Sequence, residues 1–174
     1  MKNDWSEHWG SAEWAQAQTT PRGRLEAELI DEIRGSQTAV HQMDEAAHRA
    51  LGINGTDGRC LDIIDRRGLL SAGQLAIEAG LTTGAVTAVL DRLEGKGLVR
   101  RVPDPDDRRR ILVEVTERQR EEAARLYFPL KAMADPWFEK LSEDEIRLLI
   151  SFNRVSREVN EKRAAEIRAE LEAE

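Results

Sequence analysis

The stretch Leu81–Val115, LTTGAVTAVLDRLEGKGLVRRVPDPDDRRRILVEV, decides the fold. Its pattern predicts a helix, a tight turn, a strand, a charged loop and a return strand. Thr82 and Thr83 supply the start of the helix, since a Thr hydroxyl accepts a hydrogen bond from an otherwise unpaired backbone N–H. The segment Gly95–Gly97 ends the helix, because glycine tolerates the left-handed backbone that follows a helix C-terminus.

The predicted helix has two contrasting faces. At 100° per residue, large apolar side chains share one face, which we expect to be buried: Val86, Val89, Leu90 and Leu93. The opposite, outer face carries mostly small residues: Thr83, Gly84, Thr87, Ala88 and Asp91. Small residues let a helix approach another surface closely. Threonine suits contacts with thymine methyl groups and hydrogen bonding in a major groove, and Arg92 has the reach for phosphate or guanine.

The residues after this helix predict a β-hairpin with a basic tip. Residues 98–102 and 111–115 alternate as two strands, and Pro103–Asp107 has the Pro/Asp chemistry of a turn. Three consecutive guanidinium groups follow the turn: Arg108, Arg109 and Arg110. Each can contact phosphate or enter a minor groove. A helix with a small-residue outer face beside a basic hairpin predicts a winged helix-turn-helix.

The same residues carry a resemblance to a known family. The segments that carry it are Asp91-Arg92-Leu93-Glu94, Gly97-Leu98-Val99 with Arg101, Asp107-Arg108-Arg109 with Thr116, and Asp57–Ile64 upstream. With this pattern the chain resembles the MarR family of winged-helix transcription regulators. The resemblance implies a homodimer that binds double-stranded DNA, and its operators are then expected to be pseudo-palindromic. A repressor is the expected form of regulator.

The resemblance also implies roles for single residues. It assigns groove contacts to Thr82, Thr83, Thr87 and Arg92. It assigns the wing contact to Arg109, with Asp107 orienting Arg109 through an ion pair. For Arg108 and Arg110 two interpretations stay open, because either side chain can contact phosphate or remain solvated.

We therefore expect a mainly α fold with a small β-hairpin wing, in which a winged helix-turn-helix is joined to N- and C-terminal dimerisation helices. The domain prediction is a Trp-containing extension over 1–20, helical dimerisation regions over 21–55 and 117–174, and a DNA-binding domain over 56–116. The heptad-like apolar spacing of Ile33, Val40 and Ala47 favours a helical partner for the first long helix.

Several helix ends are also predicted from local chemistry. Thr20–Pro21 starts the first long helix and Gly52 stops it. Thr56–Asp57 is expected to cap the next helix, and Ser71 the one after it. Ser142 and Glu145 form a capping-box pattern, and Asp135–Pro136 is expected to break the preceding helix.

The overall charge is unusual for a nucleic-acid binder. The 174 residues carry a formal net charge of −7. Locally, however, residues 91–110 hold seven basic and five acidic residues, whereas residues 1–50 hold five basic and nine acidic ones. The charge is therefore segregated, with a basic predicted reading head and acidic flanks.

Composition argues against several other classes of protein. The single cysteine, Cys60, excludes an intrachain disulfide and is expected to be a buried, inert thiol in a reducing compartment. Neither a membrane span nor a secretory signal is predicted, so we expect a cytoplasmic protein. No catalytic constellation, metal-ligand spacing or phosphate loop is found, so we expect no enzyme, no metal and no cofactor. The segment Gly95–Gly97 ends a helix, whereas a phosphate loop begins one.

A small effector is a further implication of the resemblance. MarR-like proteins often respond to small phenolic or anionic molecules bound between the dimer lobe and the reading heads. Candidate contacts are Trp14, His41, His48 and Arg59. The alternative is a winged-helix module that acts constitutively, or one that binds an acidic protein partner in place of DNA.

Overall fold

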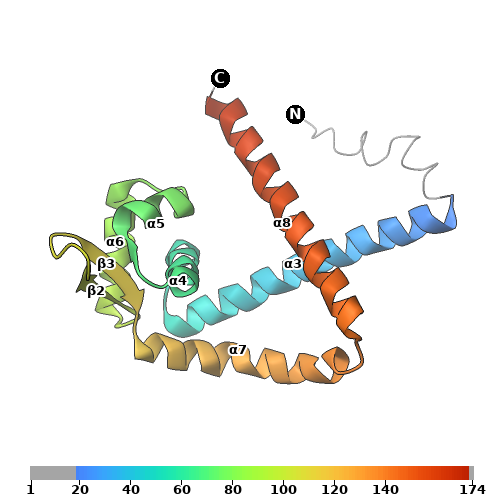
Figure 1. Cartoon of the computed structure of the whole chain (residues 1–174), viewed down its shortest axis with the longest axis horizontal. Coiled ribbons are helices and arrows are strands. Elements are labelled where there is room, and N and C mark those ends of the chain that lie inside the picture. The colour runs from blue at the N-terminus through green and yellow to red at the C-terminus, as the bar shows by residue number, and fades with distance from the viewer. Residues whose placement is uncertain (1–18, 173–174) are drawn as a thin grey trace. The chain divides into compact units, whose positions relative to one another are not determined.

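The computed structural model describes residues 19–172, so Trp14 and most of the predicted extension lie outside the described residues. In chain order the elements are α3 (Pro21–Leu51), α4 (Gly55–Arg67), β1 (Leu70–Ser71), α5 (Ala72–Ala79), α6 (Thr83–Gly95), β2 (Val99–Pro103), β3 (Ile111–Val115), α7 (Glu117–Phe138) and α8 (Glu143–Glu172) (Figure 1). Helices dominate and one small sheet accompanies them. The predicted fold class is confirmed.

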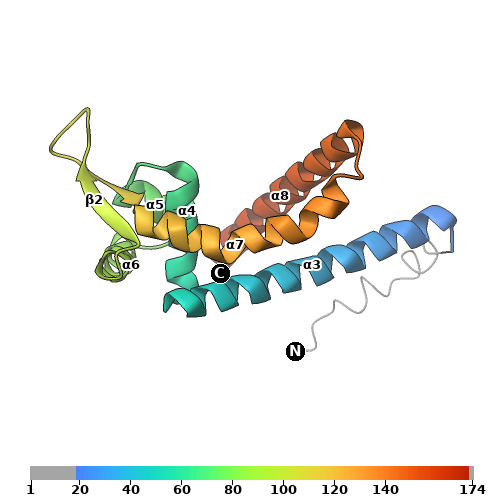
Figure 2. The same cartoon turned by 90° about the horizontal axis from the view of Figure 1, so that it is seen from below.

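The sheet is antiparallel, with strand order β1–β3–β2. The predicted hairpin is present, with Val99 opposite Val115 and Pro103 opposite Ile111. The short strand β1 adds a third member, because Leu70 pairs with Val113. The loop between β2 and β3 extends away from α4, α5 and α6 in both views (Figures 1 and 2).

One apolar core joins α4, α5, α6 and the sheet. The four residues predicted for the buried face of α6 are at most 2% exposed: Val86, Val89, Leu90 and Leu93. They pack in one cluster with residues of the neighbouring elements, among them Ile64, Leu75 and Leu98. Because burial removes this apolar surface from water, α6 is fixed through one face only. Its outer face remains available.

Most predicted helix ends are confirmed. The Thr20 hydroxyl accepts from the Gly23 N–H at 3.0 Å, and α3 stops at Gly52, whose φ is 64°. The Ser71 side chain caps α5 in a reciprocal capping box with Gln74. Ser142 and Glu145 exchange the two hydrogen bonds of the predicted box at the start of α8.

Two predicted helix boundaries were wrong. The cap of α4 is Asn54, whose side chain accepts from the Asp57 N–H at 2.9 Å, so Thr56 and Asp57 lie in the first turn. Helix α7 also continues past Asp135–Pro136 to Phe138. The proline removes only one backbone donor, and the ladder resumes where the Glu139 N–H bonds the Asp135 carbonyl at 2.9 Å.

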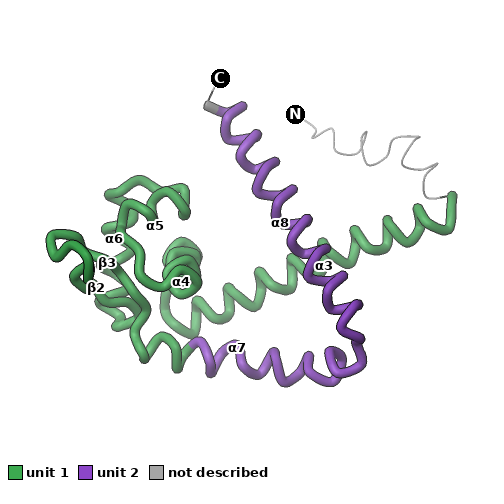
Figure 3. The backbone as a smooth tube through the Cα atoms, viewed as in Figure 1, with its two compact units in different colours: residues 1–122 green, residues 123–174 purple. Residues whose placement is uncertain are grey.

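The described chain divides into two compact units, residues 1–122 and 123–174, with the boundary inside α7 (Figure 3). The first unit therefore includes α3 together with the winged helix. The predicted dimerisation regions concern contacts between two chains, so that division stays a prediction.

In the second unit, α7 and α8 expose many large apolar side chains. On α8 a stripe at helical spacing comprises Leu148, Phe152, Val155 and Val159, which are between 36% and 69% exposed. Exposed contiguous apolar surface of this kind is typical of a protein–protein contact.

Cys60 is buried as predicted, with no exposed surface. Burial raises the pKa of the Cys60 thiol, and the nearby Arg59 opposes that effect only in part. The reactive thiolate is therefore disfavoured at neutral pH.

Candidate nucleic-acid interface

The outer face of α6 is open. The five residues that form it are all exposed: Thr83, Gly84, Thr87, Ala88 and Asp91. Outside the backbone of α6 itself, a Cβ built on Gly84 would meet no described atom within 4 Å. The Thr87 hydroxyl donates to the Thr83 carbonyl at 3.0 Å. This bond fixes the rotamer of Thr87 and leaves its oxygen lone pairs able to accept.

Thr82 has a structural task at the start of the same helix. Its hydroxyl accepts from the Ala85 N–H at 3.3 Å, which makes Thr82 the N-cap of α6. Its side chain therefore positions the first turn, and Thr83 and Thr87 are the threonines of the outer face.

Arg92 lies in an ion pair that the sequence did not predict. Its Nε donates to both carboxylate oxygens of Asp57, at 3.1 and 3.2 Å. The Asp57 side chain is 2% exposed, whereas that of Arg92 is 47% exposed. Hydrogen bonding to this carboxylate raises the pKa of the Arg92 guanidinium. The pair ties α6 to α4 and commits one edge of the guanidinium, so the structure gives Arg92 a positioning role.

A second arginine, Arg101 on β2, pairs with both acidic residues of α6. Its Nη2 lies 2.6 Å from Asp91 Oδ1, and its Nη1 pairs with Glu94. Hydrogen bonding to Asp91, with the nearby charge of Glu94, raises the pKa of Arg101. No local sequence pattern predicts this role of Arg101. One guanidinium thereby offsets part of the negative charge of two carboxylates that would otherwise repel phosphate.

The wing is built around Asp104, which is 6% exposed. Its Oδ1 accepts from the Asp106 N–H at 2.9 Å and, more weakly, from the Asp107 N–H at 3.4 Å. Arg110 Nε lies 3.6 Å from Asp104 Oδ2, and its carbonyl accepts from the Asp104 N–H. Arg110 therefore belongs to the base of the loop.

Arg109 occupies the tip of the wing. Its side chain is 92% exposed, and its Nε lies 3.3 Å from Asp107 Oδ1. The same carboxylate oxygen accepts from the Arg109 N–H at 3.1 Å. The predicted ion pair between Asp107 and Arg109 is thus present. Arg108 is also exposed. A guanidinium held at an exposed hairpin tip can enter a narrow groove.

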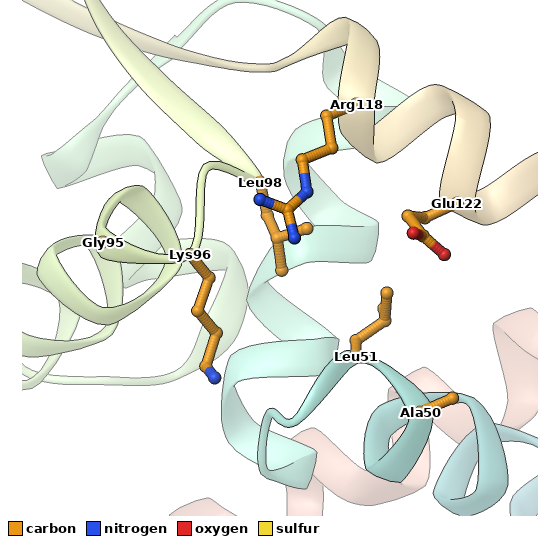
Figure 4. A pocket seen from close by; sticks show the side chains of 7 residues that line it. All are labelled: Ala50, Leu51, Gly95, Lys96, Leu98, Arg118 and Glu122. Atoms are coloured by element: carbon orange, nitrogen blue, oxygen red, sulfur yellow. The ribbon is translucent and has the colours of Figure 1, made fainter.

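Of the predicted effector residues, the structure describes His41, His48 and Arg59. His41 is exposed and lies 3.5 Å from Glu45, while Arg59 is exposed on α4. The ring of His48 packs on Gly58, where a Cβ would come within 2.4 Å of three ring atoms. None of these three residues lines the pocket of about 300 Å³ at the end of α3 (Figure 4), so the effector site stays a prediction.

Two further observations concern the described residues only. Between residues 19 and 172, no helix combines the length and apolarity needed to cross a bilayer. Within the same range, no group of three or more His, Cys, Asp or Glu side chains is arranged to hold a metal ion.

Comparison with known proteins places this geometry among regulators. The MarR family model matches residues 53–111. The uncharacterized HTH-type transcriptional regulator YcgE of Bacillus subtilis is 35% identical over 131 residues, covering 75% of this chain and 85% of the relative. Two solved structures share the fold. A mutant of S. aureus MepR bound to an oligodeoxyribonucleotide has a TM-score of 0.51 and 20% identity, covering 76% of this chain and 96% of MepR. NadR in complex with 4-hydroxyphenylacetate has a TM-score of 0.52 and 22% identity, and the match covers 72% of this chain and 88% of NadR.

The ion pair between Asp57 and Arg92 predicts unequal effects of two similar substitutions. Asp57→Ala removes a buried carboxylate and leaves Arg92 without its partner, so we expect the free energy of unfolding to fall by about 2–3 kcal/mol. The control Asp62→Ala, also on α4, breaks an exposed pair with Arg66. It should cost no more than about 0.5 kcal/mol. Urea unfolding measures both, and equal effects would contradict a structural role for the buried pair.

Proposed function

The chain belongs to the MarR family of DNA-binding transcriptional regulators, and we propose that it acts as a homodimeric, sequence-specific repressor of pseudo-palindromic operators. The observation that carries this proposal is the exposed, small-residue outer face of α6 beside the arginine-tipped hairpin. A helix can approach base edges only where its side chains are short, and the wing supplies charge next to it.

In the proposed complex, α6 enters the major groove by its outer face. Thr83 and Thr87 meet base edges, because a threonine methyl packs on thymine and a hydroxyl bonds to either strand. Thr82 holds the first turn and directs backbone N–H groups toward the DNA. Arg92 keeps α6 seated on α4 through Asp57, and the half-exposed remainder of its guanidinium is available for phosphate.

The wing makes the neighbouring contact in this proposal. Arg109 enters the minor groove, with its direction set by the ion pair to Asp107. Arg108 contacts the phosphate backbone, whereas Arg110 is held by Asp104 and shapes the loop. Pairing with Arg101 offsets one of the two negative charges that Asp91 and Glu94 bring to α6. The net charge of −7 therefore does not oppose local binding.

Dimerisation is proposed from the exposed apolar residues of α7 and α8, with α3 as a further contributor. Two copies place two reading heads on one duplex, which requires half-sites about one helical turn apart. Burial of the α8 stripe against a second copy would remove apolar surface from water.

An effector response is proposed as well. NadR, which shares the fold, is described in complex with 4-hydroxyphenylacetate, a phenolic acid. In the proposed dimer, the distance between the two winged helices must match the two half-sites of the operator. A ligand that binds best to a dimer with a different distance would shift the population away from the DNA-binding form.

The alternative function is a winged-helix module that binds an acidic protein partner or acts without a ligand. The exposed Arg109 favours this as a second candidate, because a guanidinium pairs equally well with carboxylates. Salt dependence separates the two. For duplex DNA, the logarithm of the binding constant falls steeply and linearly with the logarithm of the salt concentration, because counterions are released from the phosphates on binding.

Substitution of the wing arginine tests the proposed contact. Arg109→Ala should weaken operator binding by about 1–3 kcal/mol, because it removes one groove contact and leaves the fold unchanged. Fluorescence anisotropy with a duplex selected from a random pool by the wild-type protein measures the effect. The control Arg22→Ala removes an equally exposed arginine at the start of α3. Equal affinity of Arg109→Ala and wild type would remove the wing from the mechanism.

A charge placed in the α8 stripe tests the dimer. Val155→Glu puts a carboxylate in the centre of the proposed contact, where it would be desolvated without a partner. We expect sedimentation velocity at micromolar concentration to show monomers for this variant and dimers for wild type. The control Arg154→Glu adds a carboxylate one residue away, off the stripe, and should remain dimeric. A monomeric wild type, or a dimeric Val155→Glu, would contradict the proposed interface.

A further inference from the structure

The wing is held by the apolar core only near its base. Val99 and Val113 of the hairpin are each 2% exposed and belong to the core cluster. Farther out, Pro103 and Ile111 lie opposite each other and are exposed. The loop 104–110 then extends away from α4, α5 and α6 in both views (Figures 1 and 2). Apolar burial therefore fixes the base of the hairpin and does not by itself hold its outer half.

The polar contacts of the loop do not extend this attachment. Asp104 and Asp107 bond to N–H groups and pair with arginines of the same loop. Between residues 19 and 172, no ion pair or side-chain hydrogen bond joins residues 104–110 to a helix. The sheet gives limited support as well, because β2 is an outer strand and β1 pairs with β3 over two residues only. The angle of the hairpin therefore needs a further contact to fix it.

Arg101 on β2 makes such a contact with α6. Its Nη2 lies 2.6 Å from Asp91 Oδ1, and its Nη1 pairs with Glu94. Its backbone N–H also donates to Glu94 Oε1 at 3.3 Å. Asp91 and Glu94 are three residues apart, so they are neighbours on the surface of α6. Arg101 therefore joins the hairpin to two successive points of the helix, through its side chain and through its backbone.

A contact of this kind matters for direction more than for stability. An isolated exposed ion pair contributes little to the free energy of unfolding. The Arg101 side chain, however, is only 32% exposed, and hydrogen bonds to two carboxylates fix the plane of its guanidinium.

The length of the wing magnifies any change of angle at Arg101. At about 3.3 Å per residue, the tip lies about 15 Å beyond Arg101. The twist between neighbouring strands varies by about 20° among sheets, and a rotation of that size would move Arg109 by about 5 Å. A minor groove is only about 6 Å wide. The angle at the base of the hairpin therefore decides whether Arg109 meets the groove.

We propose that Arg101 is a positioning residue that fixes the angle of the wing relative to α6, so that the outer face of α6 and Arg109 bind DNA as one rigid unit. A wing that is already oriented loses less conformational freedom on binding, which leaves more of the contact energy for affinity. Arg101 needs no contact of its own with DNA, because it acts through Arg109. This inference rests on the proposed DNA-binding function.

Arg100, the preceding residue of β2, provides a matched control. Its Nε donates at 2.7 Å to Oε1 of Glu114, which lies directly opposite on β3. This pair stays within the hairpin and cannot set its angle relative to α6. Arg100→Gln and Arg101→Gln remove the same charge from adjacent residues, so both lose general attraction to phosphate to a similar extent. A difference between the two variants therefore reports the orientation of the wing.

A double-mutant cycle with the wing arginine tests the proposal, by fluorescence anisotropy of the full chain with the selected duplex. We expect Arg101→Gln to bind about fivefold or more weakly than Arg100→Gln. In an Arg109→Ala background the same two substitutions should differ by less than about twofold, because no wing contact is left to misplace. Equal affinities of Arg100→Gln and Arg101→Gln would overturn the proposal. The same holds if Arg101→Gln costs the same factor with and without Arg109.

A second measurement needs no DNA. In the wild-type chain, backbone residual dipolar couplings of residues 83–95 and 99–115 should fit one common alignment tensor, because the helix and the hairpin move together. In Arg101→Gln the couplings of the hairpin should shrink relative to those of α6, whereas Arg100→Gln should match the wild type. Separate tensors in the wild type, or unchanged couplings in Arg101→Gln, would overturn the proposal.

Two provisions keep this test decisive. Glu94→Ala removes the same contact from the side of α6, so it takes the place of Arg101→Gln if thermal unfolding shows that the latter does not fold. The dipolar couplings also separate the two proposals. A wild type that binds no duplex would contradict the proposed function, while the couplings would still report whether Arg101 fixes the wing.

Discussion

The constraint on which this structure depends is that α6 must be fixed firmly through one face while the other face stays small and uncovered. Its apolar residues, Val86 to Leu93, supply the first requirement by packing into the core. The buried carboxylate of Asp57 adds a directional contact through Arg92. A hydrophobic contact alone allows a helix to rotate or slide slightly, whereas a hydrogen-bonded ion pair sets its register. The side chains of the outer face can then be short, because the position of α6 does not depend on them.

Ion pairs position the charged residues around α6 and the wing, although the chain is acidic overall. Arg101 pairs with both Asp91 and Glu94, so one guanidinium offsets part of the negative charge beside the outer face of α6. In the wing, Asp104 shapes the loop and Asp107 directs Arg109, so two acidic residues serve to place a basic one. For the proposed DNA binding, the local arrangement of ion pairs therefore matters more than the net charge of the chain, because exposed charges are screened beyond about 10 Å at moderate salt.

The sequence predicted the local features of the fold and missed those that depend on contacts between distant segments. The buried face of α6 and the hairpin follow from periodicity and turn chemistry, so both were predictable. The pair between Asp57 and Arg92 joins residues 35 positions apart, and no local pattern reveals such a contact. Strand β1 has only two residues, so it is too short to show the alternation of apolar and polar residues that predicts a strand. Helix propensity alone predicts a break at Pro136, because it does not include the helical hydrogen bonds on either side that carry α7 on to Phe138.

The outer face of α6 is the feature on which the proposed function stands, and one substitution tests it directly. Ala88→Tyr adds a bulky side chain to an exposed position, so the fold should be retained while close approach to base edges is lost. Operator affinity, measured by fluorescence anisotropy alongside thermal unfolding, is predicted to fall by about 100-fold or more with an unchanged melting temperature. Wild-type affinity in Ala88→Tyr would show that this face does not enter the groove and would contradict the account.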